Sequence, residues 1–476
     1  MRTLSTTSAT DAVRAKKSSS SGTGLIVVAG FSCLVVALQQ TLVVPAVPVL
    51  PDLLSVSPVA VSWLVTATLL TGAVATPIIA RLSDMFGRKR MLILSMVFVL
   101  IGSVIAPLGG LGTLITGRAL QGLGTALVPV AMAQMRDSLP AHRVSSSLAI
   151  LSATLGVGGG IGIPLGGLIL DVFDWQSLFW TSAALSAASI VLIVLVMPAA
   201  TARTQGRFDL LGAGLLTVGL SALLVGISQG NIWGWASAPT LVSFAVALVV
   251  LLAWGRQQLA SGNPIVDLRA TASAPLLFTN LASLILGMLM FANLLLTTEQ
   301  LQSPTAAGGF GWSAAAAGLA MLPNAAAMFG VAPLTAWIAE HWGPRLVLAL
   351  GGIVTAIGYL LRLVGSPSGA MVIVWATVIG IGVGIGYAAL PMLIVRCAPG
   401  PQIGEANGVN ALVRAIGTSI ASAGVAAIGS IMAVSVEGVP VPSVAAFATI
   451  SVVAGVGGLA TVVCAGLARG EVRVQK

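Results

Sequence analysis

Three polar side chains stand inside or at the end of long apolar segments, where they could move ions or protons. Arg118 lies roughly five residues inside its segment, about 8 Å deep at 1.5 Å per residue. Gln39 lies somewhat deeper in another segment, and Glu299 ends a third. A charged side chain inside a membrane span costs at least about 2.5–3.5 kcal/mol, so Arg118 is expected to face the protein interior and to have a partner. Arg118 and Glu299 are therefore candidates for a functional site within the spans.

The sequence shows no residue pattern typical of an enzyme or a metal site. Cys33, Cys397 and Cys464 lie far apart and have no C-x-x-C spacing. The two histidines, His142 and His341, cannot complete a zinc site with them. No Ser–His or Cys–His arrangement is evident. We expect no catalytic residues, no metal and no cofactor.

The elements that position these side chains must be membrane helices, because the chain is too apolar for water. Of the 476 residues, 57% are hydrophobic and 7% are charged, and the mean hydropathy is +1.04. A soluble domain carries about 25% charged residues. Few charges and many branched apolar residues also exclude disorder. The sequence therefore predicts an all-α integral membrane protein.

Fourteen mostly apolar segments of about 20 residues predict fourteen transmembrane helices. They cover residues 25–50, 59–80, 91–111, 113–134, 145–170, 177–198, 209–228, 239–255, 275–298, 313–338, 346–365, 370–394, 406–433 and 443–467.

The basic residues predict the orientation of these spans. With the N-terminus in the cytoplasm, 19 of the 22 Lys and Arg residues fall on the cytoplasmic side, all except Arg118, Arg362 and Arg414. This is the positive-inside pattern of a bacterial cytoplasmic (inner) membrane protein. We expect residues 1–24 and 469–476 to be cytoplasmic tails. The net charge of +9 is then a topology signal, and nucleic acid is not an expected partner.

An internal repeat divides the chain into two units. Five positions match at a constant offset of 256 residues: Pro77 and Pro333, Ala80 and Ala336, Asp84 and Glu340, Gly87 and Gly343, and Lys89 and Arg345. The repeat maps the second helix onto the tenth. It predicts two six-helix bundles, 25–200 and 274–468, separated by two extra helices within 201–273. Such repeats around a central cavity are the architecture of secondary transporters.

Three motifs resemble the major facilitator superfamily, and in particular its fourteen-helix drug:proton antiporter branch. Residues 80–89 are similar to the loop signature G-x-L-a-D-r-x-G-r-k, with Ala80 in place of the first glycine. Residues 114–124 resemble the helix-4 signature l-x-x-x-R-x-x-q-G-x-g. Residues 158–167 resemble the antiporter motif g-x-x-x-G-P-x-x-G-G, with its proline displaced by one position. The resemblance implies the major facilitator fold, with the two extra helices at the periphery.

The first motif implies a gating latch at Asp84, Gly87, Arg88 and Lys89. A carboxylate at this position caps the N-terminus of a neighbouring helix in one state and releases it in the other. Glu340 would do the same in the second half. The alternative is a solvated loop that only obeys the positive-inside rule.

Helix 1 departs from the branch at the residue used for proton coupling. The branch carries an Asp where this chain has Gln39, and a Gln cannot take or release a proton. The resemblance makes Gln39 and Arg118 neighbours, so Arg118 needs another counter-charge or a substrate anion. Arg118 and Glu299 are our candidates for proton coupling, and Glu299 would carry the proton, or bind a cationic substrate, in the cavity near Arg118. The alternatives are that Arg118 snorkels to the interface and that Glu299 is a solvated carboxylate past its helix end.

The antiporter motif predicts close packing along helix 5. Gly158, Gly162 and Gly166 recur every four residues and form a bare stripe that lets a second helix approach. Pro164 predicts a kink, and Gly167 completes the motif. In the resembled family this helix packs between the two halves. The alternative is ordinary close packing without a role in antiport.

Ten residues are candidates for the wall of a substrate cavity, which usually combines apolar surface with a few polar groups. They are Gln39, Gln40, Thr41, Gln121, Phe291, Asn293, Met321, Asn324, Asn410 and Arg414. For each of them, plain packing, contact with lipid or interfacial snorkelling is the alternative.

We therefore expect a monomeric transporter surrounded by membrane lipids, which exports hydrophobic or amphipathic small molecules by proton antiport and alternating access. Because Gln39 replaces the coupling Asp, two alternatives stay open: a lipid or metabolite exporter, and an uncoupled facilitator.

Overall fold

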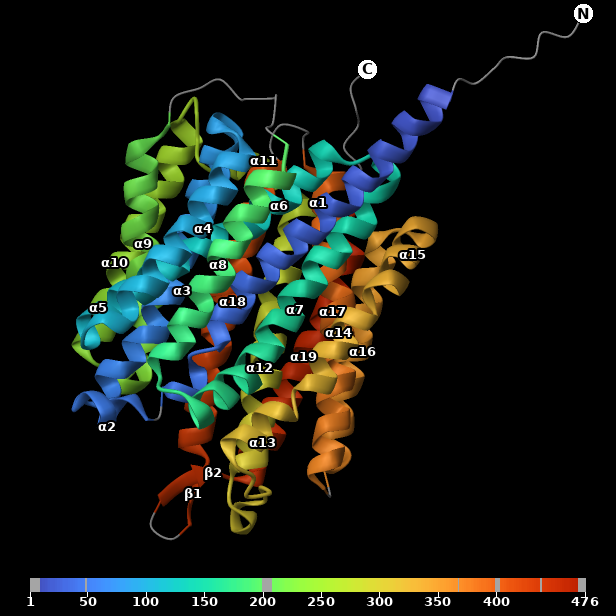
Figure 1. Cartoon of the computed structure of the whole chain (residues 1–476). Helices are drawn as coiled ribbons and strands as arrows, with labels where there is room; N and C mark the ends of the chain where they lie inside the picture. Colours follow the sequence, from blue (N-terminus) through green and yellow to red (C-terminus); the bar gives the residue numbers. More distant parts are fainter. Residues whose placement is uncertain are drawn as a thin grey trace, which may run out of the picture.

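The structure is a computed structural model that describes residues 9–47, 49–198, 208–366, 368–398, 403–436 and 439–469. Its helices lie side by side (Figure 1). Among the described residues, thirteen helical segments are long and apolar enough to cross a membrane. The remaining predicted span, 113–134, corresponds to a continuous helical stretch that carries the buried polar residues Arg118 and Gln121.

The described residues of the first bundle form eleven helical elements, eight α-helices and three short 3-10 helices. They are α1 (Ala9–Thr41), η1 (Val44–Ala46), α2 (Leu50–Leu54), α3 (Pro58–Phe86), α4 (Arg88–Ile105), η2 (Ala106–Leu108), α5 (Leu111–Leu123), η3 (Gly124–Ala126), α6 (Leu127–Ser138), α7 (Ala141–Val172) and α8 (Gln176–Val196). The helix α1 begins inside the predicted polar tail, fifteen residues or so before the apolar run.

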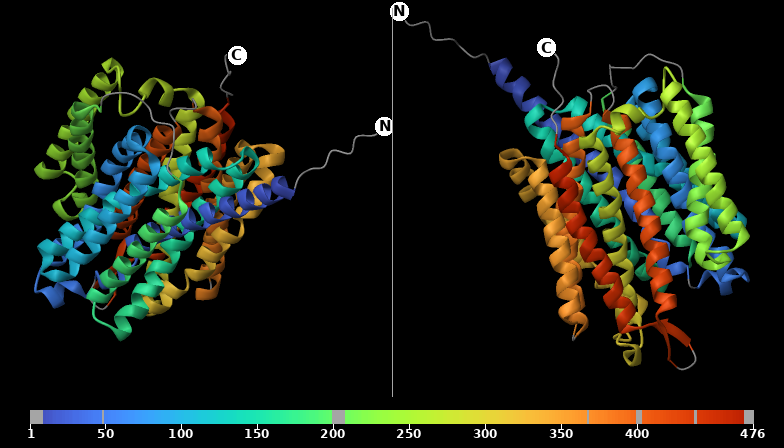
Figure 2. Two further views of the ribbon diagram at one scale, coloured as in Figure 1. Left: turned by 45° about the horizontal axis from the view of Figure 1, so that its top comes forward. Right: turned by 180° about the vertical axis from the view of Figure 1, so that it is seen from behind.

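The two extra helices are α9 (Leu210–Trp233) and α10 (Ala238–Ala260). They pack against each other at one edge of the molecule (Figures 1 and 2). The helix α9 also contacts α3 and α18, whereas α10 exposes Leu248, Val249 and Leu252 to the surroundings. The short helix α11 (Leu268–Thr271) follows in the linker to the second bundle.

The second bundle follows the linker and corresponds to the first one. Its elements are α12 (Ala274–Gln302), η4 (Thr305–Ala307), α13 (Ala314–Leu319), α14 (Leu322–Gly330), α15 (Ala332–Trp342), α16 (Pro344–Val364), α17 (Gly369–Cys397), α18 (Ile403–Ile431), β1 (Ala433–Val436), β2 (Val439–Pro442) and α19 (Val444–Leu467). The two strands form an antiparallel hairpin in which Ala433 faces Pro442. The hairpin lies at the opposite end of the bundle from the start of α1 and the end of α19 (Figure 1).

The internal repeat is visible in the element boundaries. The helix α3 corresponds at the same offset of 256 residues to the stretch from the start of α13 to the end of α15. Both copies end at a glycine with positive φ, 99° at Gly87 and 86° at Gly343, where a side chain would strain the backbone. The second copy is broken into three helices, and Pro323 and Pro333 stand in the first turns of α14 and α15 because proline cannot continue a helix.

The two bundles meet along two seams. The helix α7 contacts α13, α14, α15 and α17, and α3 contacts α18. On the first seam Gly156 faces Met328 and Gly160 faces Ala325, and on the second Gly408 faces Ala80. Small residues let the helices approach closely, which is how helices associate in lipid.

Candidate functional site

Arg118 lies on α5 and is only 2% exposed. Its guanidinium donates four hydrogen bonds, and every acceptor is a neutral oxygen. The acceptors are the main-chain carbonyls of Gln39 (2.9 Å), Gln40 (3.4 Å) and Leu64 (3.3 Å), and the side-chain oxygen of Gln121 (3.0 Å). The expected interior position of Arg118 is observed, but its partners are carbonyl dipoles contributed by α1, α3 and α5 rather than an acid.

Gln39 and Gln121 extend this network. The Gln39 side-chain amide donates to the Gln121 carbonyl (3.2 Å), so α1 and α5 are bonded in both directions. The Gln121 amide donates to Ser103 (2.8 Å), which in turn donates to Ser182 (3.1 Å). Within the described residues the Gln39 side-chain oxygen is buried and has no partner. The neighbour relation between Gln39 and Arg118 that the resemblance implies is present.

Glu299 lies on α12, three residues before the helix ends. It is partly buried, and within the described part of the chain its carboxylate has no hydrogen bond or ion pair. It is not among the groups that hold Arg118. The two proposed coupling residues are therefore on different bundles and are not in contact in this structure.

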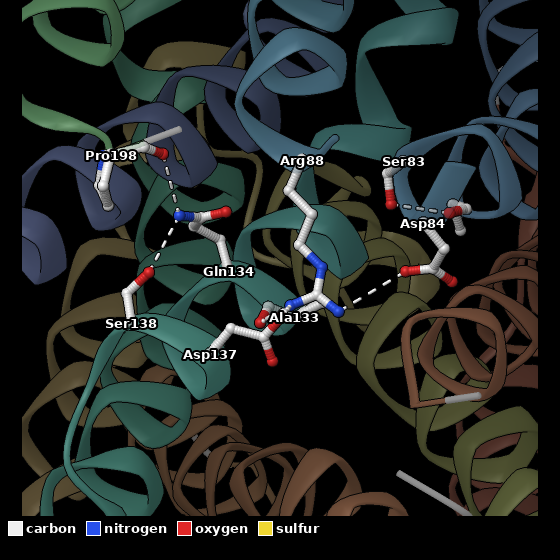
Figure 3. A network of polar contacts seen from close by, with 9 residues as sticks. Ser83, Asp84, Arg88, Ala133, Gln134, Asp137, Ser138 and Pro198 are labelled. Atoms are coloured by element: carbon white, nitrogen blue, oxygen red, sulfur yellow. Dashed lines mark hydrogen bonds and ion pairs between the residues drawn. The ribbon is translucent and has the colours of Figure 1, made fainter. Parts of the chain in front are cut away.

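The latch residues lie where α3 passes into α4. The Arg88 guanidinium stands between two carboxylates, 3.6 Å from Asp84 and in an ion pair with Asp137 on α6, and it also donates to the Ala133 carbonyl (Figure 3). Lys89 donates to the carbonyl of Val194 on α8 (2.8 Å). These contacts bind α3, α4, α6 and α8 to one another inside the first bundle.

Asp84 itself is 6% exposed, and one of its carboxylate oxygens is buried without a partner in the described residues. The expected cap on a neighbouring helix is therefore not among the contacts of this carboxylate. In the second half, Glu340 is exposed and its carboxylate makes no hydrogen bond or ion pair with the described residues. There Arg345 binds the carbonyls of Ala465 and Gly466 at the end of α19. The repeat thus conserves the backbone turn but not the ion pairs.

The helix α7 lies at the seam between the two halves, but its glycine stripe faces α1 within the first half. A Cβ on Gly158 would lie 2.6 Å from the Leu34 carbonyl, and one on Gly162 or Gly166 would overlap Thr41 or the Leu42 carbonyl. The seam between the bundles uses the other face of α7, through Gly156 and Gly160. Successive residues of a helix point about 100° apart, so residues two positions apart lie on nearly opposite faces. The motif alone therefore does not tell which face of the helix meets which partner.

The remaining motif residues lie away from α1. A Cβ on Gly167 would meet no atom within 4 Å. Pro164 lies inside α7, next to Ile163, and both approach Gly318 of α13 across the seam.

The cavity candidates fall into two groups, buried residues that join two helices and partly buried residues. Asn410 on α18 binds Asn280 (3.0 Å) and Ser283 (3.1 Å), which ties α18 to α12. Asn293 donates to the Ala376 carbonyl (3.1 Å) and so ties α12 to α17.

Asn324 and Met321 are also buried, and the Asn324 side chain fits into the space left by Gly380. Gln40, Thr41 and Phe291 are partly buried.

Arg414 is the partly buried cation of this set. Its guanidinium lies over the ring of Tyr387 on α17, 5.2 Å from the ring centroid. Its main-chain carbonyl and the base of its side chain pack against Gly287 of α12. Arg414 therefore faces the other helices of the second bundle and not lipid.

Arg362, on α16, is a buried site that sequence reasoning did not assign. It is 6% exposed and donates to Thr297 (2.9 Å), to the Leu296 carbonyl (3.3 Å) and to Gln300 (2.7 Å). Its Nε has no partner in the described residues. The signal was available, because Arg362 is one of three cations inside a predicted span. Asp137 was also missed, since it looks like an ordinary residue of a loop.

A cavity of about 320 Å³ opens between the bundles at the end where α1 begins. It is lined by Arg136 and Arg396 together with apolar side chains of α7, α15 and α17, such as Leu148 and Met392. A second cavity, of about 360 Å³, lies where the linker before α12 meets Arg81 and Glu405. The main-chain N–H of Asp267 donates to the Glu405 carboxylate there, so the linker is bound to the start of α18.

Comparisons with known proteins agree with this fold. The family model of the Major Facilitator Superfamily matches residues 29–422. Among solved structures, the proton:xylose symporter XylE has a TM-score of 0.64 at 12% identity, covering 93% of this chain and 95% of its own. The human organic anion transporter MFSD10 has a TM-score of 0.63 at 14% identity, covering 92% and 99%. These likenesses show the fold.

Curated relatives align over most of their lengths. The multidrug resistance protein Stp of Mycobacterium tuberculosis is 28% identical over 86% of this chain and 75% of its own. The tetracenomycin C resistance and export protein of Streptomyces glaucescens is 25% identical over 84% and 74%, and the cephamycin export protein CmcT of Amycolatopsis lactamdurans is 28% identical over 85% and 84%. With the family match over most of its length, its membrane spans and its fold, the chain belongs to the major facilitator superfamily and is a membrane-embedded, multi-span transporter.

Proposed function

We propose that this protein exports hydrophobic or amphipathic small molecules from the bacterial cytoplasm, as a monomer in the cytoplasmic membrane with both termini inside. The observation that carries the proposal is the set of relatives named for multidrug resistance and antibiotic export, which align over more than four-fifths of the chain. The orientation is supported by the basic residues, which gather at the end where α1 begins.

Alternating access is the mechanism that the two bundles favour. The seams at α7 and at α3 place glycines against apolar side chains, for example Gly156 against Met328 and Gly408 against Ala80. Contacts of this kind hold through shape, without many directional bonds, so one bundle can rock against the other at modest cost. The Arg88 contacts keep the first bundle rigid at its inner end during this motion.

Proton entry is the proposed driving force, with Arg118 and Glu299 as the coupling residues. The membrane potential supplies about 2.3 kcal/mol per charge per 100 mV, and the pH gradient adds to it. Glu299 is supported by its position in α12 and by its lack of a described partner, because a proton can then neutralise it without breaking an ion pair. Arg118 is supported by its buried charge beside Gln39.

A second candidate, an uncoupled facilitator or an exporter of lipids or metabolites, is favoured by one observation. Gln39 is a neutral residue in the network of Arg118, so this network contains no group that titrates near neutral pH.

Ethidium efflux from an efflux-deficient bacterial host, with and without a protonophore, tests the proposal. We expect extrusion that collapses when the protonophore is added. Efflux that ignores the protonophore would favour the uncoupled carrier, and no efflux at all would shift the substrate to a lipid or metabolite.

A further inference from the structure

The charges in the middle of the membrane are of one sign. Among the described residues every Asp and Glu lies within three positions of a helix end or in a linker. Arg118 and Arg414 lie farther in, and Arg414 is the twelfth residue of the 29 in α18, about 16 Å from its start. A buried positive charge without a nearby acid attracts anions, and the low dielectric of the interior strengthens the attraction.

The two central arginines differ in what they still offer to a ligand. Arg118 is buried, and neutral oxygens already accept four of its hydrogen bonds. Arg414 is partly buried, and within the described residues its one contact with another side chain's functional group is the ring of Tyr387. The N–H donors of Arg414 are therefore available to a ligand. A guanidinium presents these donors in a fork that fits a carboxylate.

Tyr387 adds an independent observation at the same place. It is 4% exposed, and its hydroxyl is buried without a hydrogen-bond partner in the part of the chain that the structure describes. It lies ten residues before the end of α17, about 15 Å deep, which matches the depth of Arg414 on the antiparallel α18. A buried hydroxyl without a partner is costly, and a ligand oxygen could satisfy it.

The cavity at the open end of the seam between the bundles is also positively charged. The cavity of about 320 Å³ between the bundles combines Arg136 and Arg396 with apolar walls, and none of the described residues that line it is acidic. Basic residues at this end also follow from the positive-inside rule, so the cavity supports the argument and Arg414 carries it. A molecule with an apolar body and an anionic group matches the charge of both places.

We propose that the transported molecules include amphipathic organic anions, whose anionic group is bound in mid-membrane by Arg414 and the Tyr387 hydroxyl after passing the mouth lined by Arg136 and Arg396. This inference rests on the proposed export function and specifies its substrate class. It also bears on energetics, since an anion leaving a cell with a negative interior moves down the membrane potential. Gln39 is then no obstacle to export, because part of the work needs no coupled proton.

The test compares an anionic and a cationic probe in an efflux-deficient host that expresses the full chain. The cells are loaded with carboxyfluorescein, through its membrane-permeant diacetate ester, or with ethidium, and initial efflux rates are measured. The variants are Arg414→Gln, Arg414→Lys and Tyr387→Phe. Arg345→Gln is the matched control, because Arg345 is exposed and its hydrogen bonds within the described residues go to the Ala465 and Gly466 carbonyls.

We expect carboxyfluorescein efflux that falls about 10-fold or more in Arg414→Gln and about 2- to 10-fold in Tyr387→Phe, in line with the loss of a charged and of a neutral hydrogen bond. The control variant keeps the wild-type rate. Export of ethidium without carboxyfluorescein would overturn the anionic substrate class and leave the export function standing. Export of neither probe would overturn the anionic substrate class and shift the exported molecule to a lipid or metabolite. Unchanged carboxyfluorescein efflux in all three variants would remove the site from Arg414 and Tyr387.

A binding measurement keeps the test decisive if Arg414→Gln fails to fold. Carboxyfluorescein anisotropy is measured with the purified protein in phosphatidylcholine nanodiscs, with and without added phosphatidylglycerol. Arg414→Lys keeps the charge but loses the fork, so we expect weaker binding than in the wild type and stronger binding than in a folded Arg414→Gln. Displacement of the probe by phosphatidylglycerol would assign the site to an anionic lipid headgroup and overturn the small-molecule proposal.

Discussion

The Arg118 guanidinium on α5 donates a 2.9 Å hydrogen bond to the main-chain carbonyl of Gln39 on α1. A full positive charge is thereby held among α1, α3 and α5 by dipoles, because its other described acceptors are also neutral. Buried charges of this kind are costly unless every donor finds an acceptor. The arrangement makes Arg118 rigid and leaves its charge uncompensated, and the first two predictions follow from these two properties.

Replacing Gln39 with Glu adds a carboxylate of nearly the same shape beside Arg118. The Gln39 side-chain oxygen now has no described partner, so a charged oxygen there would pair with the guanidinium. We expect efflux by Gln39→Glu to depend more steeply on pH than wild-type efflux, since this carboxylate can take up a proton. Ethidium efflux across a pH series measures it. Gln39→Met, which cannot titrate, is the control, and superimposable profiles for Gln39→Glu and the wild type would contradict the prediction.

Replacing Arg118 with Lys keeps the charge but not the geometry. A single ammonium cannot reach acceptors on α1, α3 and α5 at once, so carbonyls such as that of Leu64 lose their donor. We expect efflux to fall at least about 10-fold, the effect of losing more than one charged hydrogen bond. The rate is normalised to the amount of protein in the membrane. Arg345→Lys, on the exposed surface, should keep its activity, and equal loss in both variants would show that the network has no special role.

The two ion pairs of Arg88 should contribute differently to transport activity. The Asp84 side chain is 4% exposed, whereas that of Asp137 is 36% exposed. Exposed pairs contribute about 0–1 kcal/mol, but an acid left buried without its cation costs several times more. We expect Asp137→Asn to lower efflux only a few-fold and Arg88→Gln to abolish most of it. Arg88→Lys is the conservative control, and similar losses in Asp137→Asn and Arg88→Gln would refute this order.

The two faces of α7 should respond differently to added bulk. Gly162→Leu would collide with Thr41 and the Leu38 carbonyl of α1 inside the first bundle, so we expect a large loss of thermal stability. Gly160→Leu would collide with Ala325 across the seam, so we expect the bundle to stay folded and transport to stop. Thermal unfolding and efflux of the same samples separate the two effects. Gly159→Ala, which has no neighbour within 4 Å, should change neither quantity.

Asp209 should make the start of α9 sensitive to acid. Desolvation raises the pKa of this carboxyl, but hydrogen bonds from Gln257, the Gly212 N–H and Gln258 outweigh it, so the pKa lies below its usual value. A lowered folded-state pKa contributes stability that is present above the unfolded pKa of about 3.9 and is lost as the pH falls through the folded pKa.

Asp209→Ala removes both this charge and the cap of α9. We expect a loss of about 1 kcal/mol at neutral pH, the usual value of an N-cap, and a smaller difference from the wild type in acid. Thermal unfolding at neutral and at acidic pH measures it. Asp209→Asn, which keeps a capping oxygen without the charge, should lose less, and a stability difference that grows in acid would contradict the assignment.

Much of the fold could be predicted because its signals are local in sequence. Apolar runs, interrupted by glycine, proline and charge, located the spans to within a few residues, and the offset of 256 between Gly87 and Gly343 reappears in the boundaries of α3 and of α13 to α15. Where helix ends differ, as at the start of α1, nothing in composition separates a polar helical turn from a tail.

The candidate site was predicted in part. The position of Arg118 in the interior follows from the cost of its charge in lipid. The partners of Arg118 could not be predicted, because they are mostly main-chain carbonyls, which every residue type carries. The pairing of Arg88 with Asp137 joins residues 49 positions apart, and the network of Arg362 joins α16 to α12.

By itself, then, the sequence determined that this chain crosses a membrane many times as two related bundles, and which few polar residues lie within the spans. The tertiary structure decided which helix each of them meets. In a water-soluble protein, the buried face of a helix is apolar and the exposed face is polar, so the sequence tells the two apart. In a membrane both faces are apolar, because lipid is as apolar as the protein interior. Only the packing of distant helices places the stripe at Gly162 against α1, the seam at Gly160 and the ring of Tyr387 beneath Arg414.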